Sequence, residues 1–77
     1  INLGIGQPDF PTPAHIVEAA IQALRDGHHG YTPATGILPL REAVSSDLHR
    51  RFGVEVSPES VMIVPGGKVT MFMAVLM

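Results

Sequence analysis

The sequence contains no cysteine and no tryptophan among its 77 residues, and a single tyrosine. Without cysteine the chain can form no disulfide framework, which is a common support of domains too short for a large core. A domain of this length removes only about 60–65% of its unfolded surface from water, so its core would be marginal. The absence of cysteine also fits a reducing compartment, and we expect a soluble, cytoplasmic protein.

Charged residues are scarce as well. They make up 16% of the chain and the formal net charge is -2, which argues against a nucleic-acid-binding module because such a module needs a basic face. No basic segment followed by an apolar stretch and a small-residue cleavage site is present, so no signal peptide is indicated. The most apolar stretch, 69–77, is about half as long as a membrane span. We therefore expect no nucleic-acid partner and no membrane partner.

The two ends of the sequence suggest a piece of a longer protein. The chain starts at Ile1 without an initiator methionine, and it stops at Met77 inside an apolar run that has no capping residue. We expect truncation at both ends.

Two amphipathic helices are predicted in the first two thirds of the chain. A stiff, proline-rich connector over 7–13 precedes the first helix, which should run from Pro13 to Asp26 with Thr12 as N-cap and Gly27 as its stop. Its apolar stripe consists of Ile16, Ala19, Ala20, Ala23 and Leu24.

The second helix should begin at Leu38 or Pro39, reach Phe52, and end at Gly53 in the left-handed conformation. Its predicted buried face consists of Leu40, Ala43, Val44, Leu48 and Phe52. Arg41 and Glu42 are interpreted as part of a solvated helix face. The residues 57–60 then predict a capped turn.

The run Val61-Met62-Ile63-Val64 has four apolar residues without alternation, which favours a strand buried on both faces, as in a parallel sheet. Pro65-Gly66-Gly67 should form a tight turn, and a third helix should start near Lys68. The predicted fold class is therefore α/β, with an extended N-terminal segment, two helices, one buried strand, a glycine turn and the start of a third helix. No internal domain boundary is indicated. The strand needs partner strands from a longer chain or another copy.

The glycine turn before the third helix is the best candidate for chemistry. A helix N-terminus presents unsatisfied N–H groups and a partial positive charge, and glycines allow a phosphate to approach the backbone. The alternative is a plain turn that needs glycine for its dihedral angles. A P-loop is excluded by Met62 and Val69, which occupy its glycine and hydroxyl positions, and a dinucleotide fingerprint lacks its third glycine near Thr70 or Met71.

Three stretches, 6–13 (GQPDFPTP), 31–43 (YTPATGILPLREA) and 64–68 (VPGGK), together resemble the class I/II aminotransferases, in particular the bacterial aspartate-aminotransferase-like group. The motifs occur in the family's order and cover essentially the whole chain. The resemblance implies the fold-type-I transferase fold that depends on pyridoxal 5'-phosphate. In that fold 1–77 would be an incomplete domain, running from the N-terminal segment of the small domain into the start of the large cofactor-binding domain.

The resemblance also implies a function. The whole protein would be a homodimer with shared active sites that transfers an amino group from an amino acid to a 2-oxo acid. Two alternatives share these early motifs: a lyase or synthase of the same fold that uses the same cofactor, and the aminotransferase-like effector domain of a transcription regulator. Amino-acid specificity cannot be inferred from these motifs.

The resemblance implies roles for five residues. Gly67 and Lys68, with Val69 as a weaker third, would hold the cofactor phosphate through backbone N–H groups. Tyr31 would reach from one subunit into the neighbouring active site and touch that phosphate, unless it only anchors its own loop. Gly6 would bind the substrate carboxylate through its N–H, unless it only lets the chain turn before a proline.

No catalytic residue is expected in this chain. Lys68 is its only lysine, but the resemblance places the Schiff-base lysine further along the family's chain, so these 77 residues alone are predicted to be inactive. Val69 departs from the small or amide residue common at its position. His28-His29 could suggest a metal site, but no third ligand lies nearby and a solvated loop is the simpler interpretation, so no metal is expected.

Overall fold

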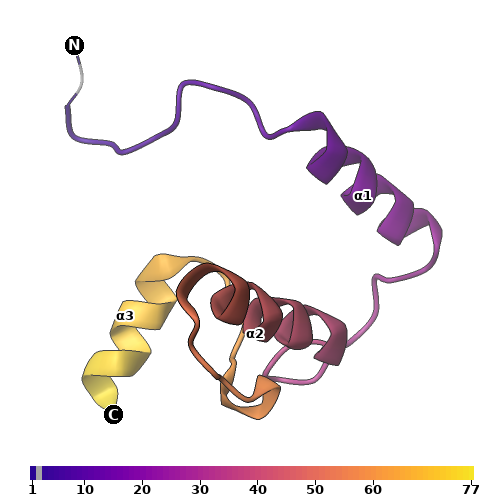
Figure 1. The fold of residues 1–77 in the computed structure, drawn as a ribbon. Helices are drawn as coiled ribbons and strands as arrows, with labels where there is room; N and C mark the ends of the chain where they lie inside the picture. The colour runs from indigo at the N-terminus through magenta and orange to yellow at the C-terminus, as the bar shows by residue number, and fades with distance from the viewer. Residues whose placement is uncertain (2) are drawn as a thin grey trace. The chain divides into compact units, whose positions relative to one another are not determined.

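The computed structural model describes residue 1 and residues 3–77, which are drawn as a ribbon in Figure 1. The helices of this described part are α1 (Ala14–Arg25), α2 (Leu38–Phe52), the short 3-10 helix η1 (Pro58–Ser60) and α3 (Gly67–Leu76). The chain divides into two compact units, Ile1–Gly30 with α1 and Tyr31–Met77 with the other helices. Over the described residues, none of these helices combines the length and the apolar character needed to cross a membrane.

Helix α1 lies within one residue of its predicted bounds at each end. Its C-terminal end follows the Schellman pattern, in which the N–H of His28 donates to the Ala23 carbonyl at 3.0 Å and that of Gly27 to the Leu24 carbonyl at 3.1 Å. Gly27 has a φ of 89°, so the prediction that it stops the helix is confirmed. The prediction for the other end was wrong: Pro13 is the N-cap and no side chain caps the helix. Thr12 therefore lies before the cap, because the extended backbone of Pro13 postpones the helix by one residue.

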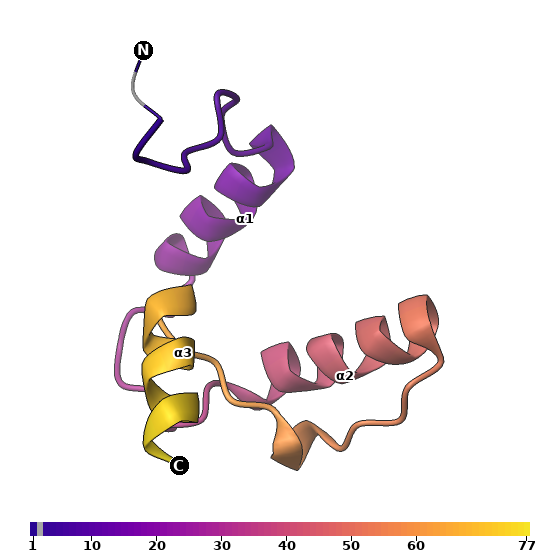
Figure 2. The ribbon, with the colours of Figure 1, turned by 90° about the vertical axis from the view of Figure 1, so that its left-hand side faces the viewer.

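Helix α2 has the predicted bounds and is the framework of the second unit. It ends at Gly53, whose φ of 66° is left-handed as predicted and whose N–H donates to the His49 carbonyl at 2.8 Å. The following segment runs back along the helix, so that η1 lies beside α2 (Figure 2). Ser57 caps η1 by accepting from the Glu59 N–H at 3.3 Å, which confirms the predicted capped turn.

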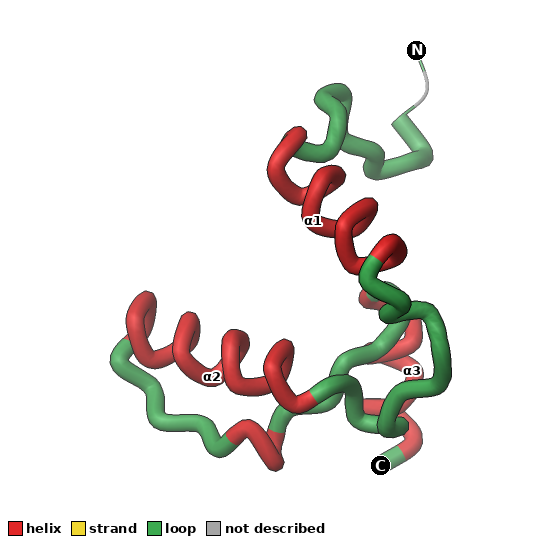
Figure 3. Tube along the Cα trace, turned by 90° about the vertical axis from the view of Figure 1, so that its right-hand side faces the viewer, coloured by secondary structure: helices red, strands yellow, loops and turns green. Residues whose placement is uncertain are grey.

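The predicted buried strand over 61–64 is absent from the described residues, none of which is assigned to a strand (Figure 3). Val61 does have extended backbone, with φ -101° and ψ 127°. The Ile63 N–H donates to the Thr35 carbonyl at 3.0 Å, but this single contact makes no ladder, and a strand requires a paired neighbour. Met62 is 55% exposed, so burial on both faces was also a wrong prediction.

No side chain in the described part of the chain is fully buried. On the predicted buried face of α2, Val44 and Leu48 are half-buried, whereas Leu40 and Phe52 are exposed. The apolar period therefore places the helices correctly, but these residues do not close a core around them.

Candidate functional site

The N-terminus of α3 presents a row of backbone N–H groups. Gly66 is its N-cap, with φ 87° and ψ 159°, and no side chain caps the helix. The N–H groups of Gly67, Lys68 and Val69 belong to the first turn, where an α-helix offers no acceptor of its own. Among the described residues, no carbonyl or side chain outside the helix accepts a hydrogen bond from these three groups. The turn thus offers three donors that point away from the body of the helix.

The two glycines keep this turn open. A Cβ added to Gly66 or to Gly67 would meet no heavy atom within 4 Å, so a ligand can approach the backbone from that side. The positive φ of Gly66 is a conformation that L-residues with side chains rarely adopt. Gly67 and Lys68 are exposed, and Val69 is half-buried. The backbone conformation of the cap therefore favours glycine, and the space beside it is open.

The charge around the turn suits an anion. Between Ser60 and Met77 there is no acidic residue, and Lys68 is the one charged side chain. The helix N-terminus adds a partial positive charge of about half a unit. Backbone N–H donors, a helix N-terminus and an ammonium group together form the donor set that binds phosphate groups in many proteins. The residues present therefore fit a phosphate.

The other two predicted site residues, Gly6 and Tyr31, lie far from this turn in the sequence. Both are exposed to solvent. Tyr31 begins the second unit, its side chain is fully exposed, and it makes no hydrogen bond with the described residues. Gly6 lies in the first unit, is exposed, and would accept a Cβ without contact within 4 Å. Gly67, Lys68 and Val69 lie within one helical turn of the second unit.

Arg41 is a residue whose importance the sequence analysis missed. Its side chain is half-buried, where a solvated face was predicted. The Nε atom donates to the Gly36 carbonyl at 3.1 Å, and Nη1 donates to the Pro58 carbonyl at 3.2 Å. The prediction of a solvated Arg41 was wrong because both carbonyls lie beside the first turns of α2. The sequence contains no specific signal for these two contacts.

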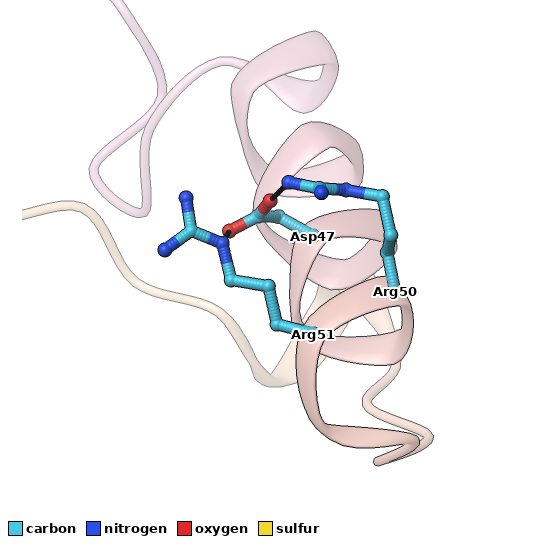
Figure 4. Close-up of polar contacts among 3 residues, drawn as sticks. All are labelled: Asp47, Arg50 and Arg51. Atoms are coloured by element: carbon cyan, nitrogen blue, oxygen red, sulfur yellow. Dashed lines mark hydrogen bonds and ion pairs between the residues drawn. The ribbon is translucent and has the colours of Figure 1, made fainter.

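The ion pairs among the described residues are exposed and are not part of this site. Asp47 accepts from Arg50 and from Arg51, whose Nε lies 2.8 Å from Asp47 Oδ2 (Figure 4). The hydrogen bond from Arg50, followed by that from Arg51, lowers the pKa of Asp47 below its ordinary value. His49 Nδ1 lies 2.9 Å from Glu55 Oε1. No group of three potential metal ligands occurs among the described residues, so His28 and His29 have no third ligand there.

Comparison with known proteins finds similarity to aminotransferases, both in a family model and in individual relatives. The model of the family "Aminotransferase class I and II" matches residues 1–76. The chain is 45% identical over 76 residues to a bifunctional aspartate aminotransferase and glutamate/aspartate-prephenate aminotransferase of Petunia hybrida, covering 99% of this chain and 16% of that protein. It is 35% identical over 79 residues to an aspartate aminotransferase of Bacillus subtilis, covering 99% of this chain and 20% of that protein.

A third relative, an aspartate aminotransferase of Sulfolobus acidocaldarius, is 43% identical over 77 residues, covering 100% of this chain and 19% of that protein. The chain therefore spans a fifth or less of the length of the curated relatives it matches.

Proposed function

This chain belongs to the aminotransferase class I and II family, and on that premise we propose that it supplies the cofactor-phosphate cradle of a pyridoxal 5'-phosphate-dependent aminotransferase. By the whole protein we mean this chain within a polypeptide of its relatives' length. The whole protein transfers an amino group from an amino acid to a 2-oxo acid. It acts as a cytoplasmic homodimer, and 1–77 forms the N-terminal segment of its small domain and the start of its cofactor-binding domain.

The observation that carries this proposal is the open row of N–H groups at the start of α3. Gly67, Lys68 and Val69 offer three donors to one anion, and no acidic side chain lies nearby in the sequence. A phosphate carries oxygens that can accept from several such donors at once, and each hydrogen bond to a charged group contributes about 1.5–3 kcal/mol. The donors lie on the backbone of a helix, so they are held in place before the ligand arrives.

Each predicted residue has a separate task in this proposal. The three N–H groups bind the phosphate and fix one end of the cofactor. The hydroxyl of Tyr31 of the neighbouring subunit donates a hydrogen bond to the same phosphate. The Gly6 N–H binds the carboxylate of the amino acid and orients it. Pyridoxal 5'-phosphate, when bound, supplies the carbonyl group and the electron-withdrawing ring needed for amino transfer. The Lys68 side chain adds positive charge near the phosphate and forms no covalent bond.

Replacing Gly67 by proline tests the cradle. Proline is well tolerated at the first position of a helix, where it removes only an N–H that has no helical acceptor. We expect Gly67→Pro in the whole protein to weaken binding of pyridoxal 5'-phosphate by about 10- to 100-fold, the loss of one hydrogen bond to a charged group. Gly67→Ala is the matched control, since it keeps the N–H. Equal affinities of the two variants would refute the cradle.

Hybrid dimers test the cross-subunit role of Tyr31. When a Tyr31→Phe subunit pairs with a Gly67→Pro subunit, a shared site predicts one cofactor site with both defects and one with neither. Half of the sites should then bind the cofactor with wild-type affinity. If Tyr31 serves its own subunit instead, every site carries one defect and no wild-type site forms. A monomeric whole protein would also refute the shared site.

A panel of amino acids and 2-oxo acids tests the reaction itself. Formation of a new amino acid from a 2-oxo acid supports transamination. Release of ammonia and a 2-oxo acid from the amino acid alone would instead indicate a lyase of the same fold. Cofactor binding without any turnover would favour an effector domain.

A further inference from the structure

Arg41 connects three parts of the second unit: the first turn of α2, the turn at Gly36 just before the helix, and η1, which follows it in the sequence. The residue lies in the first turn of α2, and its guanidinium donates to the carbonyl of Gly36 before the helix and to that of Pro58 in η1. A guanidinium presents its N–H groups in a rigid planar fork, so two contacts fix the direction of both carbonyls. One side chain therefore sets the loop before α2 against the segment that returns after it.

Both of the joined segments lead to residues of the proposed cofactor site. On one side, the Gly36 N–H donates to the Pro33 carbonyl at 2.9 Å, which closes a turn in the loop that starts at Tyr31. On the other side, η1 passes into 61–64 and then to the Gly66 cap of α3. Arg41 thus contacts the end of the loop that starts at Tyr31, and it contacts η1, from which the chain continues to the N-terminus of α3.

The two segments also touch each other directly. The Ile63 N–H donates to the Thr35 carbonyl at 3.0 Å. At Gly36 the packing is so close that an added Cβ would lie 2.6 Å from Ile63 Cγ1 and 2.8 Å from its Cβ. A shift of the Gly36 turn therefore moves Ile63, which lies three residues before the N-cap of α3.

We infer that Arg41 is a positioning residue for phosphate recognition. It holds the loop that starts at Tyr31 and the segment 61–66 before α3 in the geometry required by the phosphate sites of the two subunits. The inference rests on the proposed function. It goes beyond that function because Arg41 contacts no proposed ligand and acts through the Gly36 turn and Ile63. Since Tyr31 is proposed to serve the neighbouring subunit, one guanidinium contributes to the sites of both subunits.

The test compares binding of pyridoxal 5'-phosphate with binding of pyridoxal, which lacks the phosphate, to the apo form of the whole protein. We expect Arg41→Met to weaken binding of the phosphorylated compound about tenfold or more and to leave the affinity for pyridoxal unchanged. Arg41→Lys should give an intermediate loss, because an ammonium cannot reproduce the two-pronged contact. Arg50→Met is the matched control on the same helix, since Arg50 pairs only with exposed Asp47.

Hydrogen exchange of the Ile63 amide provides a second measurement that needs no cofactor. In both Arg41 variants this amide should exchange faster than in the wild type and in Arg50→Met, because its bond to Thr35 loses the support of the Gly36 turn. If Arg41→Met fails to fold, Arg41→Lys provides the measurement instead. It keeps the positive charge but cannot make both carbonyl contacts, so it tests the positioning of the Gly36 turn in a folded protein.

Each outcome separates this inference from the proposed function. If the wild type prefers pyridoxal 5'-phosphate to pyridoxal and the Arg41 variants keep that preference, the inference is overturned and the cradle stands. If the variants lose both compounds equally, Arg41 has only a structural role. If the wild type binds neither compound, the proposed function and this inference fail together.

Discussion

A methyl group at Gly36 should destabilise the protein through one identifiable contact. In Gly36→Ala the new Cβ would lie 2.6 Å from Ile63 Cγ1, whereas nonbonded carbon atoms prefer separations of about 3.5–4.0 Å. Ile63 must therefore move by roughly 1 Å. The movement is opposed by the Ile63 N–H bond to Thr35, because the backbone of Ile63 is held at the same point.

The magnitude follows from three contributions. Overpacking costs about 1–3 kcal/mol, and a positive φ, here 98°, costs a residue with a Cβ about 1–2 kcal/mol. Replacing glycine also restricts the unfolded chain, which offsets about 0.4–1 kcal/mol. We expect Gly36→Ala to lower the free energy of unfolding of the whole protein by about 3 kcal/mol, within a range of about 1–4.5 kcal/mol.

Gly53→Ala is the control that isolates the contact. Gly53 also has a positive φ, 66°, but an added Cβ there meets nothing within 4 Å, so only about 1 kcal/mol should be lost. Urea denaturation of the whole protein measures both changes, provided that the slope of the transition stays constant. Equal losses in the two variants would refute the close packing of Gly36 on Ile63.

Two further predictions concern charged side chains. Lys68→Ala should weaken cofactor binding less than Gly67→Pro does, because the backbone donors remain. After borohydride reduction of the cofactor-loaded whole protein, peptide mass analysis should find no pyridoxyl group on Lys68. A stoichiometric adduct at Lys68 would contradict its proposed non-covalent role. Asp47→Asn should lower stability slightly at neutral pH, since Arg50 and Arg51 depress the Asp47 pKa below 3.8 and stabilise the folded state above that value. The difference from the wild type, followed by denaturation across pH, should shrink as the pH falls through the lowered pKa, and a constant difference would show that the ion pairs are not its cause.

The helices could be predicted from the sequence because their signals are local. The three- and four-residue apolar period placed α1 and α2, and Gly27 and Gly53 ended them with positive φ, as expected. Gly66 and Gly67, the N-cap and the first residue of α3, likewise predicted an open helix N-terminus, which the structure contains. These features depend on residues within a few positions of one another, so the linear sequence contains the necessary information.

The prediction of a strand over 61–64 was wrong because strand pairing is not local. The apolar run 61–64 is typical of a buried strand, and Val61 adopts extended backbone. A ladder also needs neighbouring strands, which the described residues do not contain. The Thr12 cap failed for a smaller reason: proline is favoured at the first helical position, but Pro13 has a ψ of 140° and is itself the N-cap.

Arg41 shows why an amphipathic pattern is an incomplete guide to charged residues. On α2 the pattern treats Arg41, Arg50 and Arg51 alike, as solvated. Arg50 and Arg51 share the carboxylate of Asp47, and a bond between two flexible, exposed side chains does little to fix the backbone. Arg41 instead donates to two backbone carbonyls, so each bond directly restricts the path of the chain. A charged group held by neutral carbonyls gives up part of its hydration without gaining a counter-ion. Its contribution therefore lies in placing the Gly36 turn and η1, which are the two segments that lead to the proposed phosphate site.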